Sequence, residues 1–279
     1  MHQLIVDPIS PRPFLKWAGG KGQLIAQYRP FFPAEHEYDT YYEPFVGGGA
    51  IFFWLLPGRS RLMDINPELV NVYRCVRSEV EAVIQALRVH ELNHNKEYYY
   101  FIRAHLPERP AERAARFIYL NKTCFNGLYR ENSRGQFNVP MGSYKNPRIC
   151  NPDLLRTASR ALRRAELIEG SFDQVLQEAV GDRDFVYFDP PYQPLSQTSS
   201  FTAYSRYSFT ETDQVRLRDV FVELAARGVR VLLSNSDCEF IRELYQGFPI
   251  QTISAIRAIN SNAQRRGKIT EVLVMSREP

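Results

Sequence analysis

The stretch that decides the fold reads Asp184-Phe185-Val186-Tyr187-Phe188-Asp189-Pro190-Pro191-Tyr192. Its apolar, β-prone start is bounded by breakers, which predicts a buried strand over Phe185–Phe188. A residue before proline is pushed into extended geometry, so we expect Asp189 at the carboxyl end of that strand with its carboxylate facing outward. The two prolines leave rigid carbonyl acceptors, and Tyr192 adds a flat ring beside them. This arrangement suits a planar group that carries an amino group, such as a nucleobase; a strand followed by a surface turn is the alternative.

A second strand-and-turn unit lies earlier, at Tyr41-Tyr42-Glu43-Pro44-Phe45-Val46-Gly47-Gly48-Gly49-Ala50. It predicts a short strand, a glycine-rich turn and a helix over 51–56, and small residues at such a turn let the backbone approach a nucleotide. The dinucleotide pattern G-x-G-x-x-G is not met, because Phe52 stands where the third glycine belongs. The next strand is expected to end at Asp64, where Rossmann-like proteins bind ribose hydroxyls, and Asn66-Pro67-Glu68 has the residues that begin a helix.

The segment Lys16-Trp17-Ala18-Gly19-Gly20-Lys21 resembles a phosphate-binding loop superficially. Because Gly22 follows Lys21, the spacing G-x-x-x-x-G-K-[ST] is missing, and we reject a P-loop nucleotidase. An aromatic ring, two flexible glycines and a cation remain, and these can line a small-ligand pocket. A loop that leads into a helix at Leu24 and Ile25 is an equal alternative.

The composition is that of a globular protein, with 44% hydrophobic and 24% charged residues in 279. No apolar run approaches the roughly 18 residues that cross a bilayer, and the start of the chain has no signal-peptide pattern. The 4 cysteines are widely spaced, which favours buried thiols in a reducing compartment over a disulfide or a zinc site. We therefore expect a cytoplasmic protein without a membrane partner.

Positive charge is concentrated in the middle of the chain. Between Arg103 and Arg164 there are 13 lysines and arginines but 4 aspartates and glutamates, whereas the whole chain has a net charge of +4. This concentration points to a polyanion such as nucleic acid. Over 121–140, Asn-Gly and Arg-Gly turns alternate with aromatic residues, Arg and Asn, which predicts a loop and hairpin displayed from helices over 79–90 and 111–120. Arg and Asn can read base edges, and apolar residues can wedge between base steps.

The α/β pattern resumes after the basic segment. A helix over 211–227 is expected to begin at Thr210, with Asp213 three residues on. The connector 257–268 has four cations and no acid, which suits contact with phosphates. Strands are expected over 165–168, 185–188, 229–233, 250–256 and 271–275.

Four motifs in sequence resemble the Dam and DpnM-like DNA adenine-N6 methyltransferases of the D12 class, in the class-alpha order. The motifs are Lys16–Lys21, Glu43–Gly49, Asp64 and Asp189–Tyr192, and the basic segment adds Phe125–Arg130 and Gln136–Pro140. The resemblance extends from about Phe14 to the C-terminus. It implies an α/β fold, a Rossmann-like methyltransferase sheet that binds S-adenosylmethionine, with an inserted, mostly helical DNA-recognition subdomain containing a β-hairpin. We expect the catalytic domain over 1–75 and 165–279 and the recognition subdomain over 76–164.

The resemblance also implies roles for individual residues. The catalytic residues would be Asp189, Pro190, Pro191 and Tyr192. Those that bind the cofactor would be Trp17, Lys21, Glu43, Phe45, Gly47, Gly49, Asp64, Phe172 and Asp189, with Asp64 on the ribose and Phe172 beside the adenine. Those that contact DNA would be Phe125, Asn126, Leu128, Arg130, Asn138, Pro140, Tyr144, Lys145, Arg265 and Arg266, with Arg130 reading guanine and Phe125 acting as the wedge.

The implied activity is methyl transfer from S-adenosyl-L-methionine to N6 of adenine in duplex DNA, within GATC and by base flipping, with S-adenosyl-L-homocysteine as product and no metal. Double-stranded DNA is the expected partner, with a separately acting restriction endonuclease as a further one. We expect a monomer or weak dimer near the nucleoid of a bacterium or in a phage-infected cell. The alternatives are a different recognition site, an amino-group methyltransferase of RNA or of protein glutamine, a non-catalytic DNA-binding module, and a nicotinamide oxidoreductase, which the missing third glycine disfavours.

Overall fold

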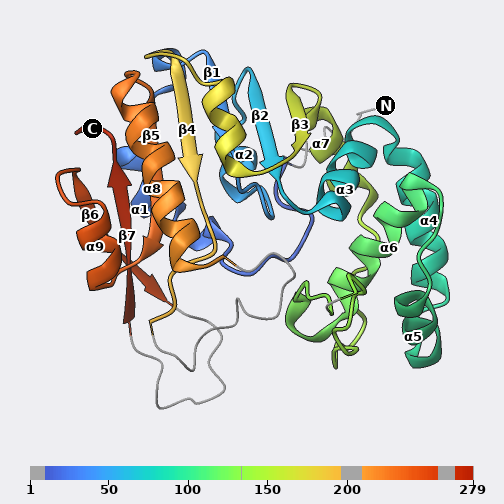
Figure 1. Ribbon diagram of the computed structural model, residues 1–279. Helices are drawn as coiled ribbons and strands as arrows, with labels where there is room; N and C mark the ends of the chain where they lie inside the picture. The colour runs from blue at the N-terminus through green and yellow to red at the C-terminus, as the bar shows by residue number, and fades with distance from the viewer. Residues whose placement is uncertain (1–9, 133, 196–208, 257–267, 279) are drawn as a thin grey trace.

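A seven-stranded sheet forms the centre of the computed structural model (Figure 1), which describes residues 10–132, 134–195, 209–256 and 268–278. The strand order is β3-β2-β1-β4-β5-β7-β6. The first five strands in this order are parallel, and β7 pairs antiparallel with both β5 and β6. The strands are β1 (Thr40–Glu43), β2 (Ser60–Asp64), β3 (Ala165–Glu169), β4 (Asp184–Phe188), β5 (Arg230–Ser236), β6 (Ile250–Ile256) and β7 (Lys268–Met275).

This order confirms the predicted Rossmann-like sheet. The chain winds outward from β1 to β3 and then returns to add β4 on the other side of β1, where Thr40 pairs with Asp184. In open α/β sheets, ligands bind at such a reversal, beyond the carboxyl ends of the strands. The segments after β1 and β4 are the glycine turn and the Asp-Pro-Pro-Tyr motif.

The sheet is buried on both faces, as parallel sheets require. Along β4, Phe185 and Tyr187 face one buried cluster, whereas Val186 and Phe188 face the other. This alternation of successive side chains is the two-residue period of a strand. The cluster around Phe185 includes residues of α1, α2 and α3, and the cluster around Val186 includes residues of α8 and α9.

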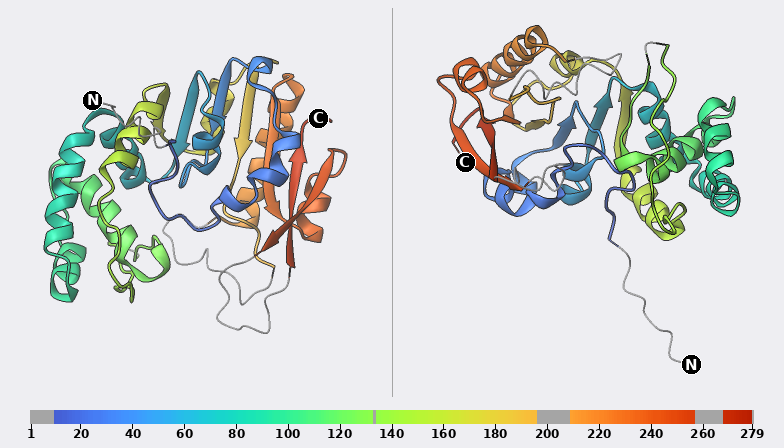
Figure 2. Two further views of the ribbon diagram at one scale, coloured as in Figure 1. Left: turned by 180° about the vertical axis from the view of Figure 1, so that it is seen from behind. Right: turned by 90° about the horizontal axis from the view of Figure 1, so that it is seen from below.

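The helices surround the sheet and extend from one end of it (Figures 1 and 2). The segments α4 to α7 come between α3 and β3 in the chain, and buried residues of α4, α6 and α7 continue the cluster that contains Phe185. The helices are α1 (Ile25–Tyr28), α2 (Ala50–Leu55), α3 (Pro67–Ser78), α4 (Val80–Leu92), α5 (Lys96–Ala104), α6 (Pro110–Thr123), α7 (Pro152–Leu162), α8 (Glu211–Ala226) and α9 (Glu239–Leu244). Among the described helices, none is long and apolar enough to cross a membrane.

Two predicted helix starts are confirmed by their caps. Asn66 accepts hydrogen bonds from the backbone N–H groups of Glu68 and Leu69 at the start of α3. At the start of α8, the side chains of Thr210 and Asp213 cap each other's backbone N–H groups. Both starts use side-chain oxygens to satisfy first-turn donors that have no partner within the helix.

In the described part of the basic segment, the expected hairpin is formed by two isolated antiparallel bridges, Cys124 with Met141 and Glu131 with Phe137. Regular strands are interrupted because Asn126 and Gly127 have positive φ angles and because Pro140 has no N–H to donate. This segment lies on the same lower side of the molecule in Figure 1 as the carboxyl ends of the parallel strands.

Candidate active site at the carboxyl ends of the strands

Asp189 lies just beyond the carboxyl end of β4, beside β1, where the strand order reverses. Its Oδ1 is 2.8 Å from Nζ of Lys21 and accepts a hydrogen bond of 3.0 Å from Oγ of Ser234 on β5. The Ser234 hydroxyl also lies 2.9 Å from that of Tyr187. The Lys21 side chain is 3% exposed and that of Asp189 is 22% exposed. A buried cation and a partly exposed carboxylate therefore form the charged centre of the site.

The ring of Tyr192 is held beside this ion pair. Its hydroxyl donates a hydrogen bond of 2.8 Å to Oε2 of Glu271 on β7, and Tyr28 donates one of 3.3 Å to the same oxygen. Nζ of Lys21 lies 4.6 Å from the centre of the Tyr192 ring. Burial, together with nearby negative charge, raises the pKa of Tyr192 well above its ordinary value. The phenol therefore stays neutral and donates to Glu271.

Two buried amides hold the backbone that follows Asp189. The Pro191 carbonyl accepts a hydrogen bond of 3.0 Å from Gln214 on α8, and the Gln214 side-chain oxygen accepts one of 3.0 Å from Asn235 on β5. Asn235 in turn accepts a hydrogen bond of 3.0 Å from the backbone N–H of Gln193. Pro190 is buried whereas Pro191 is exposed. The turn is thus fixed on both sides of Tyr192.

The glycine turn after β1 is held by Asp64 at the end of β2. The two Asp64 carboxylate oxygens accept hydrogen bonds from the backbone N–H groups of Gly47, at 3.2 Å, and Asn66, at 2.9 Å. Burial raises the pKa of Asp64 to about 6, although these hydrogen bonds oppose the rise. Gly47 and Gly49 have φ angles of 47° and 69°, a region that favours glycine.

Trp17 lies against this turn. A Cβ atom at Gly47 would be 2.7 Å from the Trp17 ring, so the close approach also requires glycine. The indole is stacked with Phe117 of α6, at 6.4 Å between ring centres, and with Tyr129, at 6.1 Å. Trp17 therefore connects the glycine turn with residues of the basic segment.

Glu43 is the last residue of β1, just before the turn. It is buried and accepts a hydrogen bond of 2.9 Å from the Tyr41 hydroxyl. Burial raises the pKa of Glu43 to about 8, and the charge of Asp189 adds to the rise, whereas the hydrogen bond from Tyr41 lowers it. Glu43 is thus a protonated, internal neighbour of Asp189 at neutral pH.

Aromatic rings gather around Phe45, two residues before Gly47. Phe45 is stacked with Phe172 at 5.4 Å between ring centres, and Phe209 meets Phe45 edge-on at 5.7 Å. The guanidinium of Arg216 lies 5.3 Å from the centre of the Phe172 ring. Phe172, the residue expected beside an adenine, thus belongs to an apolar group that includes Phe45 of the turn.

Six of the residues expected to contact DNA lie in the segment that the Cys124–Met141 bridge closes: Phe125, Asn126, Leu128, Arg130, Asn138 and Pro140. Nε of Arg130 donates a hydrogen bond of 2.7 Å to the side chain of Asn138, which fixes the direction of the guanidinium. Phe125 is 51% exposed, and its backbone N–H donates to the Pro140 carbonyl at 2.9 Å. Asn126 is exposed and Leu128 is half-buried. The structure therefore brings the expected wedge and the expected base-reading residues into one loop.

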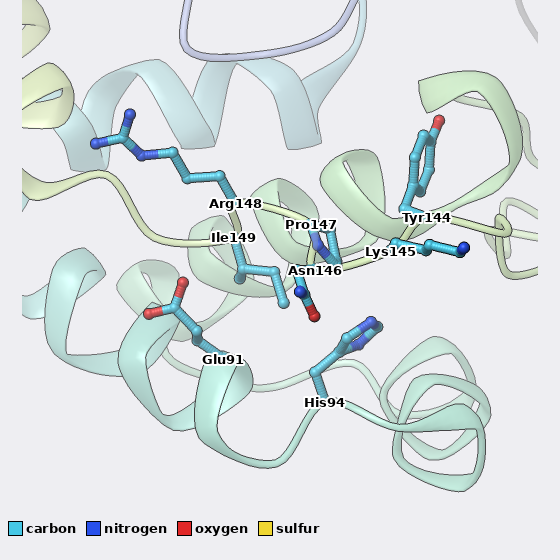
Figure 3. Close-up of a pocket in the computed structure, with 8 residues that line it drawn as sticks. All are labelled: Glu91, His94, Tyr144, Lys145, Asn146, Pro147, Arg148 and Ile149. Carbon is cyan, nitrogen blue, oxygen red and sulfur yellow. The ribbon is translucent and has the colours of Figure 1, made fainter.

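Tyr144 and Lys145 lie farther along, where a hollow of about 800 Å³ separates them from the end of α4 (Figure 3). Nζ of Lys16 lies 3.8 Å from the centre of the Tyr144 ring. The hollow is lined by Glu91, His94, Tyr144, Lys145, Asn146, Pro147, Arg148 and Ile149, and none of these was expected to bind the cofactor. Arg265 and Arg266 lie outside the described residues.

Comparison with known proteins identifies the family. Residues 17–259 match the D12 class of N6 adenine-specific DNA methyltransferases. The chain belongs to this family. The matched region contains the glycine turn, the basic segment and the Asp189–Tyr192 motif, so the predicted family and fold class are confirmed.

Individual relatives align with the enzyme over most of their length. It is 44% identical to the type II methyltransferase M1.LlaDCHI of Lactococcus lactis subsp. cremoris, with 98% of both chains covered. It is 41% identical to the type II methyltransferase M.MjaIII of Methanocaldococcus jannaschii, covering 95% of this chain and 99% of the relative. The DNA adenine methylase of Escherichia coli is 38% identical, with 95% of both chains covered. The enzyme is an adenine-specific DNA methyltransferase.

Sequence reasoning missed several residues that hold the candidate site together. Ser234 and Asn235 directly follow the strand predicted over 229–233 and lie within β5 in the structure, but no role was assigned to them. Gln214 lies within the predicted helix at a buried position, and a polar residue on the buried side of an amphipathic helix is the signal that could have found it. Tyr28 and Glu271 had no such signal, because their contact joins positions 243 residues apart.

Proposed function

We propose that the enzyme transfers a methyl group from S-adenosylmethionine to N6 of an adenine that is flipped out of duplex DNA, within the sequence GATC. The observation that carries this proposal is the pairing of Asp189 with Lys21 at the reversal of the strand order, beside Tyr192. The family fixes adenine N6 as the class of target. The cofactor, the flipped base and GATC are the parts proposed.

The residues around the glycine turn fit S-adenosylmethionine. Lys21 and Asp189 present opposite charges 2.8 Å apart, which match the carboxylate and ammonium of an amino acid. Asp64 has carboxylate acceptors at the end of β2, where a ribose is bound in this type of fold. Phe45 and Phe172 offer apolar ring faces for an adenine. When bound, the cofactor supplies a sulfonium methyl as the electrophile.

The target amino group would be held by Asp189 and Pro190. The lone pair of adenine N6 is delocalised into the ring, so N6 is a poor nucleophile. We assign the two N6 hydrogens to the Asp189 carboxylate and the Pro190 carbonyl, which favours pyramidal nitrogen and stabilises the positive charge that develops on it. Lys21 and Ser234 both contact Oδ1 of Asp189, so Oδ2 is assigned to the substrate. The N6 proton can leave after methyl transfer, without prior deprotonation.

Extrusion of the base costs a few kcal/mol and has to be offset in the pocket. Stacking of the adenine on the Tyr192 ring would contribute about 1–3 kcal/mol. The hydrogen bond from the Tyr192 hydroxyl to Glu271 orients the ring before the base arrives. The rigid turn on both sides of Tyr192 therefore supports a preformed platform.

Sequence selection would come from the segment 76–164, acting as the target-recognition subdomain. Arg130 would read a guanine with its direction fixed by Asn138, and exposed Phe125 would wedge between base steps. GATC is assigned because Phe125–Arg130 and Gln136–Pro140 resemble the enzymes that modify this sequence. We further propose that the protein is a monomer or weak dimer in the cytoplasm. A restriction endonuclease that acts separately would be its partner.

One assay tests the proposal. Purified enzyme is incubated with tritiated S-adenosylmethionine and an adenine-unmethylated duplex that holds one GATC, beside a duplex of the same composition with a scrambled site. Label is expected in N6-methyladenine of the GATC duplex, and the product should resist an endonuclease that methylation of GATC blocks. Equal labelling of both duplexes would contradict the site, and absence of label from both would contradict the cofactor assignment.

A further inference from the structure

A single buried asparagine joins two loops that the proposed function assigns to different ligands. Asn121, on α6, is 1% exposed. Its Oδ1 accepts a hydrogen bond of 2.8 Å from the backbone N–H of Lys16, and its Nδ2 donates to the Lys16 carbonyl at 2.7 Å. Nδ2 also donates to the Gly127 carbonyl at 3.1 Å. We call 16–21 the N-terminal loop and 124–130 the recognition loop.

The packing around Asn121 leaves the two loops little room to move apart. Gly127 has a φ angle of 64°, and a Cβ atom there would lie 2.6 Å from the Lys16 side chain. The Lys16 ammonium donates to the carbonyl of Lys122, at 3.3 Å. One residue later, the indole of Trp17 is stacked with Tyr129 of the recognition loop. Contacts of Lys16 with Gly127 and of Trp17 with Tyr129 thus join the two loops, and Lys16 also binds the end of α6.

Each loop belongs to a different part of the site. The N-terminal loop ends at Lys21, which contacts Asp189, and Trp17 within it lies against Gly47 of the glycine turn. The recognition loop ends at Arg130. A ligand that orders one loop therefore lowers the conformational entropy still to be lost when a second ligand orders the other.

We propose that Asn121 is a positioning residue that couples cofactor binding to recognition of the DNA sequence. The inference rests on the proposed function, because it assigns the cofactor to the N-terminal loop and DNA to the recognition loop. Asn121 touches neither ligand. It sets the position of Lys16 relative to Gly127, and through them the position of Lys21 relative to Arg130.

Coupling between two ligands is reciprocal, which makes the claim measurable from both sides. S-adenosylhomocysteine should tighten binding of a GATC duplex, and the duplex should tighten binding of S-adenosylhomocysteine by the same factor. Factors of about 5 to 150 are typical of such coupling. Because this probe has no transferable methyl group, binding can be measured without turnover.

The experiment measures this factor in full-length wild type, Asn121→Ala, Asn121→Asp and Asn71→Ala, with melting temperatures recorded in parallel. Asn121→Asp keeps an acceptor for the Lys16 N–H and the side-chain volume, but it loses the donor for the two carbonyls. Asn71→Ala is the matched control, because Asn71 Nδ2 donates 3.0 Å to the Pro110 carbonyl and so links α3 to α6 without touching either loop.

We expect the coupling factor to fall to about one in both Asn121 variants and to stay at the wild-type value in Asn71→Ala. A purely structural role would instead lower the melting temperature and leave the factor unchanged. The inference is overturned if wild type shows no coupling, if folded Asn121→Asp retains the full factor, or if Asn71→Ala loses it equally. Methyl transfer by the wild-type preparation to the GATC duplex is assayed separately, so failure of the proposed function is distinguished from failure of the coupling.

Discussion

Lys21 and Asp189 are 2.8 Å apart but differ in their access to water, since the lysine is buried and the aspartate is partly exposed. Lys21 comes from the N-terminal loop and Asp189 follows the end of β4. Their contact therefore links two segments that the proposed cofactor site brings together. A buried charge that loses its partner is costly, whereas an exposed one can be solvated. The two members of the pair should therefore respond differently to substitution.

The first prediction is an asymmetry in stability. Asp189→Ala leaves a buried ammonium without its carboxylate and should lower the free energy of unfolding by about 3 kcal/mol. This value is near the lower end of the costs measured when one partner of a buried ion pair is removed. Lys21→Met leaves a carboxylate that water can reach and should cost about 1 kcal/mol. Urea unfolding of both variants measures the difference. Equal losses, or a larger loss for Lys21→Met, would contradict this account of the pair.

The second prediction concerns the reading of one base pair. Arg130→Ala should lose about 1–3 kcal/mol of discrimination at one guanine of the site. Asn138→Ala should lose less, because it removes the hydrogen bond that directs the guanidinium but leaves the guanidinium itself. Competition binding with duplexes that differ at single positions measures both. Arg109→Ala is the control, since that side chain is 83% exposed at the start of α6. An unchanged site preference in Arg130→Ala would contradict the assignment.

The third prediction follows from the pKa of Glu43, which burial raises from 4.5 to about 8. Between these values the folded protein keeps a proton that the unfolded chain releases, so rising pH favours unfolding. The contribution of Glu43 to stability is fully present below about pH 4.5 and is lost as pH rises to about 8, by at most about 1.4 kcal/mol per pH unit.

Glu43→Gln keeps an acceptor for the Tyr41 hydroxyl and removes the titrating proton. The difference in unfolding free energy between wild type and this variant should therefore change between pH 5 and pH 8. As the pH rises, the variant should become more stable relative to wild type. Urea unfolding across this range measures it. A difference that does not vary with pH would show that Glu43 does not titrate as described.

The fourth prediction concerns the amide pair behind the turn. Asn235→Ala removes the partner of Gln214 and of the Gln193 N–H, and leaving a buried group unpaired costs about 1–3 kcal/mol. Gln214→Ala should cost a similar amount, but the double variant should lose less than the sum, because the two side chains share one hydrogen bond. Unfolding measures stability and steady-state kinetics measures kcat. Additive losses, or variants with unchanged kcat, would contradict a role in positioning the turn.

Sequence reasoning predicted the sheet well because its signals are local. The run Phe185–Phe188 has breakers on both sides, and the resulting strand differs from the prediction by one residue, Asp184. The strand end at Asp64 is marked by the residues that begin the next helix, and the strand end before Asp189 is marked by the two prolines that follow it. The pairing of β1 with β4, which brings the Asp189–Tyr192 motif beside the glycine turn, has no local signal and comes from the structure.

Two helices within 76–164, α5 and α7, were not predicted although they begin with recognisable caps. Asn95 caps α5, and Asn151 caps α7 with Pro152 in its first turn, as Asn66 and Pro67 do for α3. The long-range contacts of the site could not be predicted from local sequence patterns. The hydrogen bonds of Asn121 join positions 105 residues apart, and those of Glu271 join it to Tyr28 and Tyr192 across the sheet. Such partners are set by the tertiary fold.

The central claim is that the Asp189 carboxylate holds the amino group of a flipped adenine. The most direct measurement is single-turnover methyl transfer to a GATC duplex by Asp189→Ala and by the isosteric Asp189→Asn, at saturating S-adenosylmethionine, with DNA binding measured in parallel. We predict rates at least about 10²–10³ below wild type in both variants, with cofactor-dependent DNA binding partly retained. Methyl transfer at the wild-type rate in either variant would contradict the claim.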